Sequence, residues 1–139
     1  MTKTEIAQQY QTILKQEGFS PEIDSDGDVT FKYEAGLYVI IIDEKDPTFL
    51  RLCYPNFLDT ESAPNSILSL YKSIDKANRR VKVAKVYFIK DDVWANVETY
   101  LPEIGALKDS IQQYLRILQT IVKDTINNLS EEMADSKKA

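Results

Sequence analysis

The sequence predicts an α+β domain in which three helices cover an antiparallel sheet made of a meander and a separate hairpin. Two observations predict this class. Runs rich in β-branched and aromatic residues, separated by Gly, Asp and Pro, occur at positions 29–33, 37–42 and 48–54, and again at 81–89 and 93–99. Amphipathic patterns with helical spacing lie before, between and after these groups. The expected order is α-β-β-β(-β)-α-β-β-α, with the bracketed strand a short one at 22–24.

Length and composition indicate one ordinary domain. The chain has 139 residues, of which 43% are hydrophobic, so we expect a single core over residues 1–129 and a fraying polar tail over 130–139. The net charge of −5 argues against nucleic acid and anionic membranes as partners, because positive potential recruits both. The start has no apolar signal segment, so we expect a cytoplasmic protein. The single Cys53 lies within an apolar strand and is expected to be a buried, unreactive thiol.

The first helix is expected over residues 3–17. Thr2 and Glu5 have the spacing of a capping box, and Gly18 suits the left-handed position that ends a helix. The apolar face of this helix comprises Ile6, Tyr10, Ile13 and Leu14.

Two acidic clusters suggest metal binding or acid–base chemistry. Asp24, Asp26 and Asp28 match the first positions of a calcium loop, but the later positions that need Gly and Glu are Val29 and Ala35. A hairpin turn at residues 26–27 is the alternative. The second cluster comprises Asp43, Glu44 and Asp46. It is either a site that needs a pocket or a solvated turn.

The run Leu37–Ile42 is apolar on both faces, so each face must be buried against another element or another protein. We expect helices to cover Leu37, Val39 and Ile41, and another protein to cover Tyr38, Ile40 and Ile42. Trp94 lies on the side of the last strand opposite Val93, Ala95 and Val97, where it is either a lone surface aromatic or part of a contact patch.

The second helix is expected to begin near Pro64 and to end near Val81. Its apolar stripe comprises Ile67, Leu70, Tyr71, Ile74, Ala77 and Val81. Asn78 projects onto this stripe and is expected to bond to nearby backbone. A basic row on the opposite face is either solvated or receives an acidic peptide or phosphate. That row comprises Lys72, Lys76, Arg79 and Arg80.

The last helix is expected to follow Leu101-Pro102 and to run for about 30 residues, or ~45 Å, which exceeds the ~35–40 Å width of a domain of this size. Part of it should overhang, so Ile126, Leu129 and Met133 are expected to fray or to pack on another subunit.

The element order resembles the type III secretion chaperone-like fold, together with Ala77-Asn78 at the end of the second helix and Leu101-Pro102 before the last. Within that fold, the chain is similar to the YbjN-like domains, which are proposed bacterial sensory transduction regulators, and to small cyanobacterial proteins like them. The resemblance implies a non-enzymatic homodimer that holds a partner polypeptide or acts as a regulatory adaptor.

Two functions remain open at this point. The first is a homodimeric protein-binding module without a cofactor, since the chain has no His, one Cys and few Gly. Its candidate interface comprises Tyr38, Ile40, Ile42, Trp94, Ile126 and Leu129. The second is a small-ligand-binding domain or enzyme, with a pocket between sheet and helices lined by Tyr33, Tyr54 or Tyr87.

Overall fold

The computed structural model describes residues 1–63 and 66–138, with side chains as far as Asp135. Its helices are α1 (Lys3–Gln16), α2 (Ile67–Arg80) and α3 (Ile111–Lys138), with 3₁₀ segments η1 (Thr60–Ser62) and η2 (Ile104–Asp109). Its strands are β1 (Glu22–Ile23), β2 (Val29–Tyr33), β3 (Gly36–Ile40), β4 (Phe49–Asp59), β5 (Ala84–Ile89) and β6 (Asp92–Tyr100). The α+β class and the element order predicted from the sequence are confirmed.

The six strands form one sheet in the order β1-β2-β3-β4-β6-β5, and every neighbouring pair is antiparallel. Strands β1 to β4 form the meander, and the β5–β6 hairpin joins it through pairing of β6 with β4. The pairing of β4 with β6 is interrupted between Tyr54 and Leu58, which lengthens β4 by a bulge. Strand β5 is therefore one edge of the sheet, and the two-residue β1 is the other.

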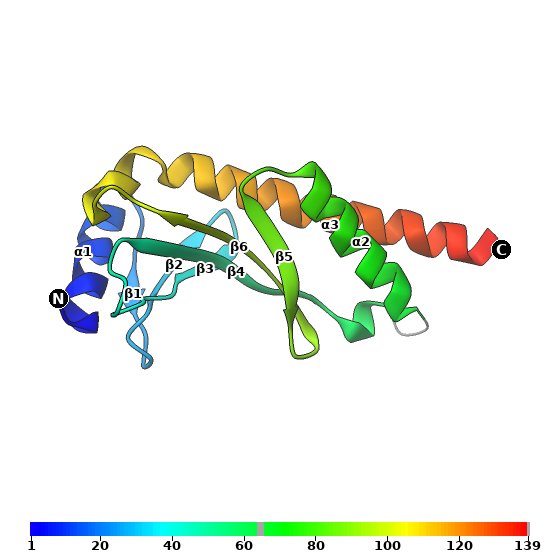
Figure 1. Cartoon of the computed structure of the whole chain (residues 1–139), viewed down its shortest axis with the longest axis horizontal. Helices are drawn as coiled ribbons and strands as arrows, with labels where there is room; N and C mark the ends of the chain where they lie inside the picture. Colours follow the sequence, from blue (N-terminus) through cyan, green and yellow to red (C-terminus); the bar gives the residue numbers. More distant parts are fainter. Residues whose placement is uncertain (64–65, 139) are drawn as a thin grey trace.

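The helices pack against one face of the sheet. Figure 1 shows α3 running along the sheet, with α1 at one end and α2 beside it at the other, and the C-terminal end of α3 extending past α2. One hydrophobic cluster joins the buried faces of the helices to alternate residues of the strands. Its largest buried side chains include Tyr10, Phe31, Ile40, Leu52 and Leu118.

Local sequence signals predict where the first helix, α1, begins and ends. Thr2 and Glu5 form the predicted capping box, with reciprocal bonds of 3.1 and 3.2 Å, and Gly18 has a φ of +92°. Helix α2 begins later than expected, because Ser66 caps it; the predicted start at Pro64 lies outside the described residues. Helix α3 also begins later, because residues 104–109 form η2 instead.

The polar residues from Ser130 onward, predicted to fray, continue α3 as far as Lys138. Two contacts hold this end: Glu132 pairs with Lys76 of α2, and Met133 packs against the core. Packing against α2 therefore overrides the polar composition that predicted a tail.

The predicted cover of β3 is wrong. Tyr38, Ile40 and Ile42 are buried in the core of the chain itself, whereas Leu37 is 51% exposed. The register decides this, because Phe31 pairs with Tyr38, and Lys32 pairs with Leu37. Directly paired residues share a face, so the face that holds Lys32 is the one without helices.

Candidate interaction surfaces

The helix-free face of the sheet is closed at its centre by its own side chains. Cys53 and Asn96, which pair with each other across β4 and β6, are both fully buried there. Glu98 accepts a 2.7 Å hydrogen bond from Asn96 Nδ2 and forms ion pairs with Arg51 at 3.6 Å and Lys85 at 3.0 Å. This charged network leaves little apolar area for a partner at the centre of the face.

The Cys53 thiol has no reactive character. Burial raises its pKa to about 12, so the thiol stays protonated at neutral pH. The prediction of a buried cysteine is confirmed. Burial also raises the pKa of Tyr10 and that of Tyr38 to about 12, which keeps both phenols neutral.

Trp94 lies on the helix-free face and is half-buried. It pairs with Tyr87 of β5, near the bulge of β4. Its indole Nε1 is buried and has no hydrogen-bond partner among the described residues, an arrangement that costs ~1–3 kcal/mol. Trp94 remains a candidate contact residue at the edge of this face.

The first turns of α2 carry an exposed apolar surface. Ile67, Leu68 and Tyr71 are 43%, 59% and 55% exposed, and the Tyr71 ring lies 5.0 Å from that of Phe88 in β5. We call these four residues the α2 apolar patch. The sequence placed Ile67 and Tyr71 in the core stripe, and this is wrong. The sequence could have revealed this error, because the predicted apolar stripe is wider than the single helix face that packs against a core.

The residues that do face the core from α2 are Leu70, Ile74 and Ala77. The contact between α2 and α3 is partly polar, because Asn128 Nδ2 donates a 3.3 Å hydrogen bond to the Ser73 carbonyl. We call this contact the polar seam. Leu129 is buried along this seam, whereas Ile126 is 41% exposed. The expectation that Leu129 contacts another subunit is therefore wrong, and Ile126 stays a candidate contact residue.

The predicted basic row is used mostly within the chain. Lys76 pairs with Glu132, and Arg80 Nη1 lies 3.4 Å from Asp124 and 3.0 Å from the Asn128 side-chain oxygen. Arg79 forms an ion pair with Asp75 at 3.1 Å. Lys72 lines a hollow together with Glu132 and Asp135. The basic row therefore serves mainly to hold α2 against α3, and it leaves little positive charge for binding a partner.

Asn78 bonds to backbone, as predicted. Its Nδ2 donates to the Val86 carbonyl at 2.9 Å, and its Oδ1 accepts from the Val86 N–H at 2.7 Å. The amide therefore joins the end of α2 to the edge strand β5.

In each acidic cluster, two of the three carboxylates accept hydrogen bonds from the chain itself. Asp24 Oδ1 accepts hydrogen bonds from the N–H groups of Asp26 and Asp28, and Asp28 accepts one from the Ile42 N–H. Asp46 accepts a 2.7 Å bond from the Tyr100 hydroxyl, which raises the pKa of that phenol. Over residues 1–63 and 66–138, no three His, Cys, Asp or Glu side chains are grouped so that they could hold a metal ion.

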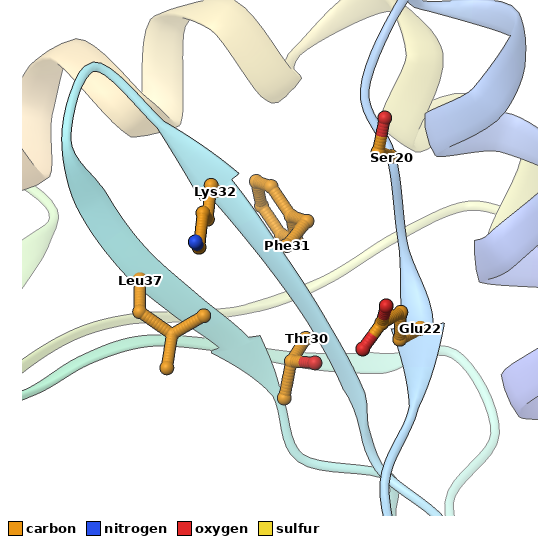
Figure 2. Close-up of a pocket in the computed structure, with 6 residues that line it drawn as sticks. All are labelled: Ser20, Glu22, Thr30, Phe31, Lys32 and Leu37. Atoms are coloured by element: carbon orange, nitrogen blue, oxygen red, sulfur yellow. The ribbon is translucent and has the colours of Figure 1, made fainter.

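The tyrosines of the ligand hypothesis line neither of the two hollows described below, nor the one beside Lys72. Tyr33 and Tyr54 belong to an aromatic cluster around Tyr38, and Tyr87 lies beneath Lys85. A hollow of about 300 Å³ lies beside β1 and β2, where Figure 2 shows Glu22 of β1 pointing towards β2. It is lined by Ser20, Glu22, Thr30, Phe31, Lys32 and Leu37.

A second hollow, of about 560 Å³, lies between the end of α2, the turn before β5, and α3. It is lined by Arg80, Val81, Lys82, Val83, Gln113, Arg116, Ile117 and Thr120. The sequence did not single out Lys82 or Arg116, because they come from different elements and share no motif.

No helix in the described part of the chain is long and apolar enough to cross a membrane. Comparison with curated proteins gave no match. Among solved structures, the chain is similar to the Yersinia pestis type III secretion chaperone SycH, solved in complex with a stable fragment of YscM2. The TM-score is 0.48 and the identity 13%, over 86% of this chain and 99% of that one.

The family model YbjN, described as "Putative bacterial sensory transduction regulator", matches residues 9–131. This match covers the whole of the sheet, α2, and α3 as far as residue 131, and it confirms the family resemblance seen in the sequence. The chain belongs to the YbjN family.

Proposed function

We propose that this chain is a non-enzymatic, homodimeric protein-binding module of the cytoplasm that acts as a regulatory adaptor. The observation that carries the proposal is the α2 apolar patch, which exposes Ile67, Leu68 and Tyr71 to water. Exposed apolar area that is contiguous is typical of a surface that a partner covers. The family's description as a sensory transduction regulator supports the regulatory part.

A second copy of the chain is the occupant that fits this patch best. A two-fold axis through the patch would bring apolar side chains against their own copies, which is how isologous interfaces form. Its rim carries both signs of charge, because Lys72 and Asp135 line one hollow with Leu68. Lys72 of one copy can then meet an acid of the other without like charges being opposed.

Continuation of the sheet across β5 is a poorer route to a dimer. The outward N–H and C=O of Val86 already bond to Asn78, so a second strand could not pair there. The proposed interface therefore uses the helix surface rather than the strand edge.

The absence of catalysis is also part of the proposal. The sequence contains no histidine, and burial keeps the Cys53 thiol protonated. The carboxylates of Asp24 and Asp28 accept hydrogen bonds from backbone N–H groups, which favours a role in the turn over a role in catalysis.

The test is the solution mass of the full chain, measured by light scattering during size exclusion. We expect a dimer for the wild type and a folded monomer for the double variant Leu68→Asp, Tyr71→Lys. The matched control is Leu37→Asp, which changes a comparably exposed side chain on the helix-free face and should remain dimeric. A wild-type monomer, or a dimeric patch variant, would contradict the proposal; circular dichroism confirms that each variant is folded.

A further inference from the structure

The groove between the end of α2, the turn before β5, and α3 is basic in an acidic protein. Its rims carry Arg80, Lys82 and Arg116, and none of its lining residues is acidic, although the chain has a net charge of −5. A local excess of positive charge within a negative surface attracts and orients anionic groups. We call this hollow of about 560 Å³ the basic groove.

Two of the three cations are available to a ligand. Arg80 is held by Asp124 and Asn128, which fixes the position of its guanidinium. Lys82 and Arg116 are exposed, and neither forms an ion pair with the residues that the structure describes. Lys82 lies in the turn before β5 and Arg116 lies in α3, so the two cations come from opposite sides of the groove.

The apolar part of the groove includes a strained residue. Val83 has a φ of +73°, a conformation that a β-branched residue rarely adopts and that costs ~1–3 kcal/mol. It is also 58% exposed, so no burial of its side chain offsets this strain. The turn is held by a 2.8 Å bond from the Ala84 N–H to the Lys82 carbonyl, and it presents Val83 beside Val81 and Ile117.

We propose that the basic groove binds an acidic segment of a partner protein, whose carboxylates meet Lys82 and Arg116 and whose apolar side chains cover Val81, Val83 and Ile117. This inference rests on the proposed protein-binding function and names the chemistry of the partner. The groove is open rather than enclosed, and its lining alternates charge with apolar surface, which suits an extended peptide.

A second copy of the chain does not fit this groove. A two-fold packing would place the same three cations against each other, which is electrostatically unfavourable. On α2 the apolar patch ends at Tyr71, whereas the groove begins at Arg80, so about 9 residues of helix, or ~14 Å, separate them. A dimer formed through the patch therefore leaves one groove open on each copy.

The inference is tested by nuclear magnetic resonance on the ¹⁵N-labelled full chain, titrated with a capped nonapeptide in which glutamate and leucine alternate. We expect shift changes confined to residues 80–83 and 113–120. The double variant Lys82→Glu, Arg116→Glu should weaken binding by about tenfold or more, and added salt should weaken it further. Lys82→Arg with Arg116→Lys should retain binding.

The control variant is Lys15→Glu with Lys90→Glu, which makes the same charge change at two exposed positions outside the groove. It should bind within about twofold of the wild type. Equal binding of a peptide with lysine in place of glutamate, shift changes elsewhere, or unchanged binding by the groove variant would each overturn the inference. Solution mass is measured on the same samples: a dimer that does not bind the peptide overturns only this inference, and a monomer that binds it overturns only the homodimer.

Discussion

Asn78 and Val86 are joined by two hydrogen bonds, in which the side-chain amide of one residue pairs with both backbone polar groups of the other. Val86 lies on β5, the edge of the sheet, so the amide takes the place that a neighbouring strand would occupy. The Ala84 N–H, two residues earlier, is also occupied, by the Lys82 carbonyl. One side chain thus both fixes α2 to the sheet and blocks the sheet's edge at Val86.

We expect Asn78→Ala to destabilise the chain by ~1–3 kcal/mol, because it removes both hydrogen bonds between the amide and the Val86 backbone, each worth ~0.5–1.5 kcal/mol net. It should also increase self-association, since the edge of β5 becomes open to pairing. Chemical denaturation measures the first effect, and light scattering at rising concentration measures the second. Asn127→Ala, an exposed position on α3, is the control and should change neither. An Asn78 variant as stable as this control would show that the two hydrogen bonds contribute nothing net.

Substitution by aspartate should have opposite effects on the two faces of β3. Ile40 is fully buried and Leu37 is 51% exposed. Ile40→Asp should prevent folding because it buries an unpaired carboxylate, whereas Leu37→Asp should fold as the wild type does. Near-ultraviolet circular dichroism and thermal unfolding distinguish the outcomes. A folded Ile40→Asp chain would mean that the helix-covered face has been assigned incorrectly.

The Lys76–Glu132 pair makes stability depend on pH. The hydrogen bond from Lys76 lowers the pKa of Glu132 below its ordinary value of 4.5. A carboxyl group with a lowered pKa in the folded state stabilises that state above its unfolded pKa, and this contribution is lost as the pH falls through the folded value. Glu132→Gln should therefore lower the melting temperature at about pH 7 and have a smaller effect near about pH 3. Glu131→Gln, an exposed neighbour, should show no such dependence; an equal loss at both pH values would argue against the ion pair.

The end of α3 should be essential for the packing of α2. Leu129 is buried and Ile126 is 41% exposed, although both belong to the same predicted stripe. Leu129→Ala should cost ~2–5 kcal/mol, and Ile126→Ala should stay within about 0.5 kcal/mol. Urea denaturation of both variants measures the difference. Similar losses for the two would indicate that the end of α3 packs differently from the structure.

Features set by residues close in sequence were predictable. The capping box of Thr2 and Glu5, the turn at Gly18 and the backbone bond of Asn78 each depend on local spacing or on a polar group within an apolar stripe. Such signals do not require knowledge of the tertiary arrangement.

Features set by packing between distant elements were not predictable in the same way. Both faces of β3 are apolar, so alternation along that strand alone could not assign the inner face. The two-residue turn Glu34-Ala35 was the overlooked signal, because it sets Tyr33 opposite Gly36 and thus Lys32 opposite Leu37. The basic groove had no comparable signal, since Lys82 and Arg116 come together only when α3 packs beside the turn before β5.

The pairing of β4 with β6 has a consequence for synthesis of the chain. Strand β4 has β3 as one neighbour, but its other neighbour is β6, which follows α2 and β5 in the chain. As the chain leaves the ribosome, β4 therefore has an open edge that carries Leu50 and Leu52 until β6 has emerged. Helix α3, which covers both strands, emerges after them. We expect the centre of the sheet to be among the last parts of this domain to close.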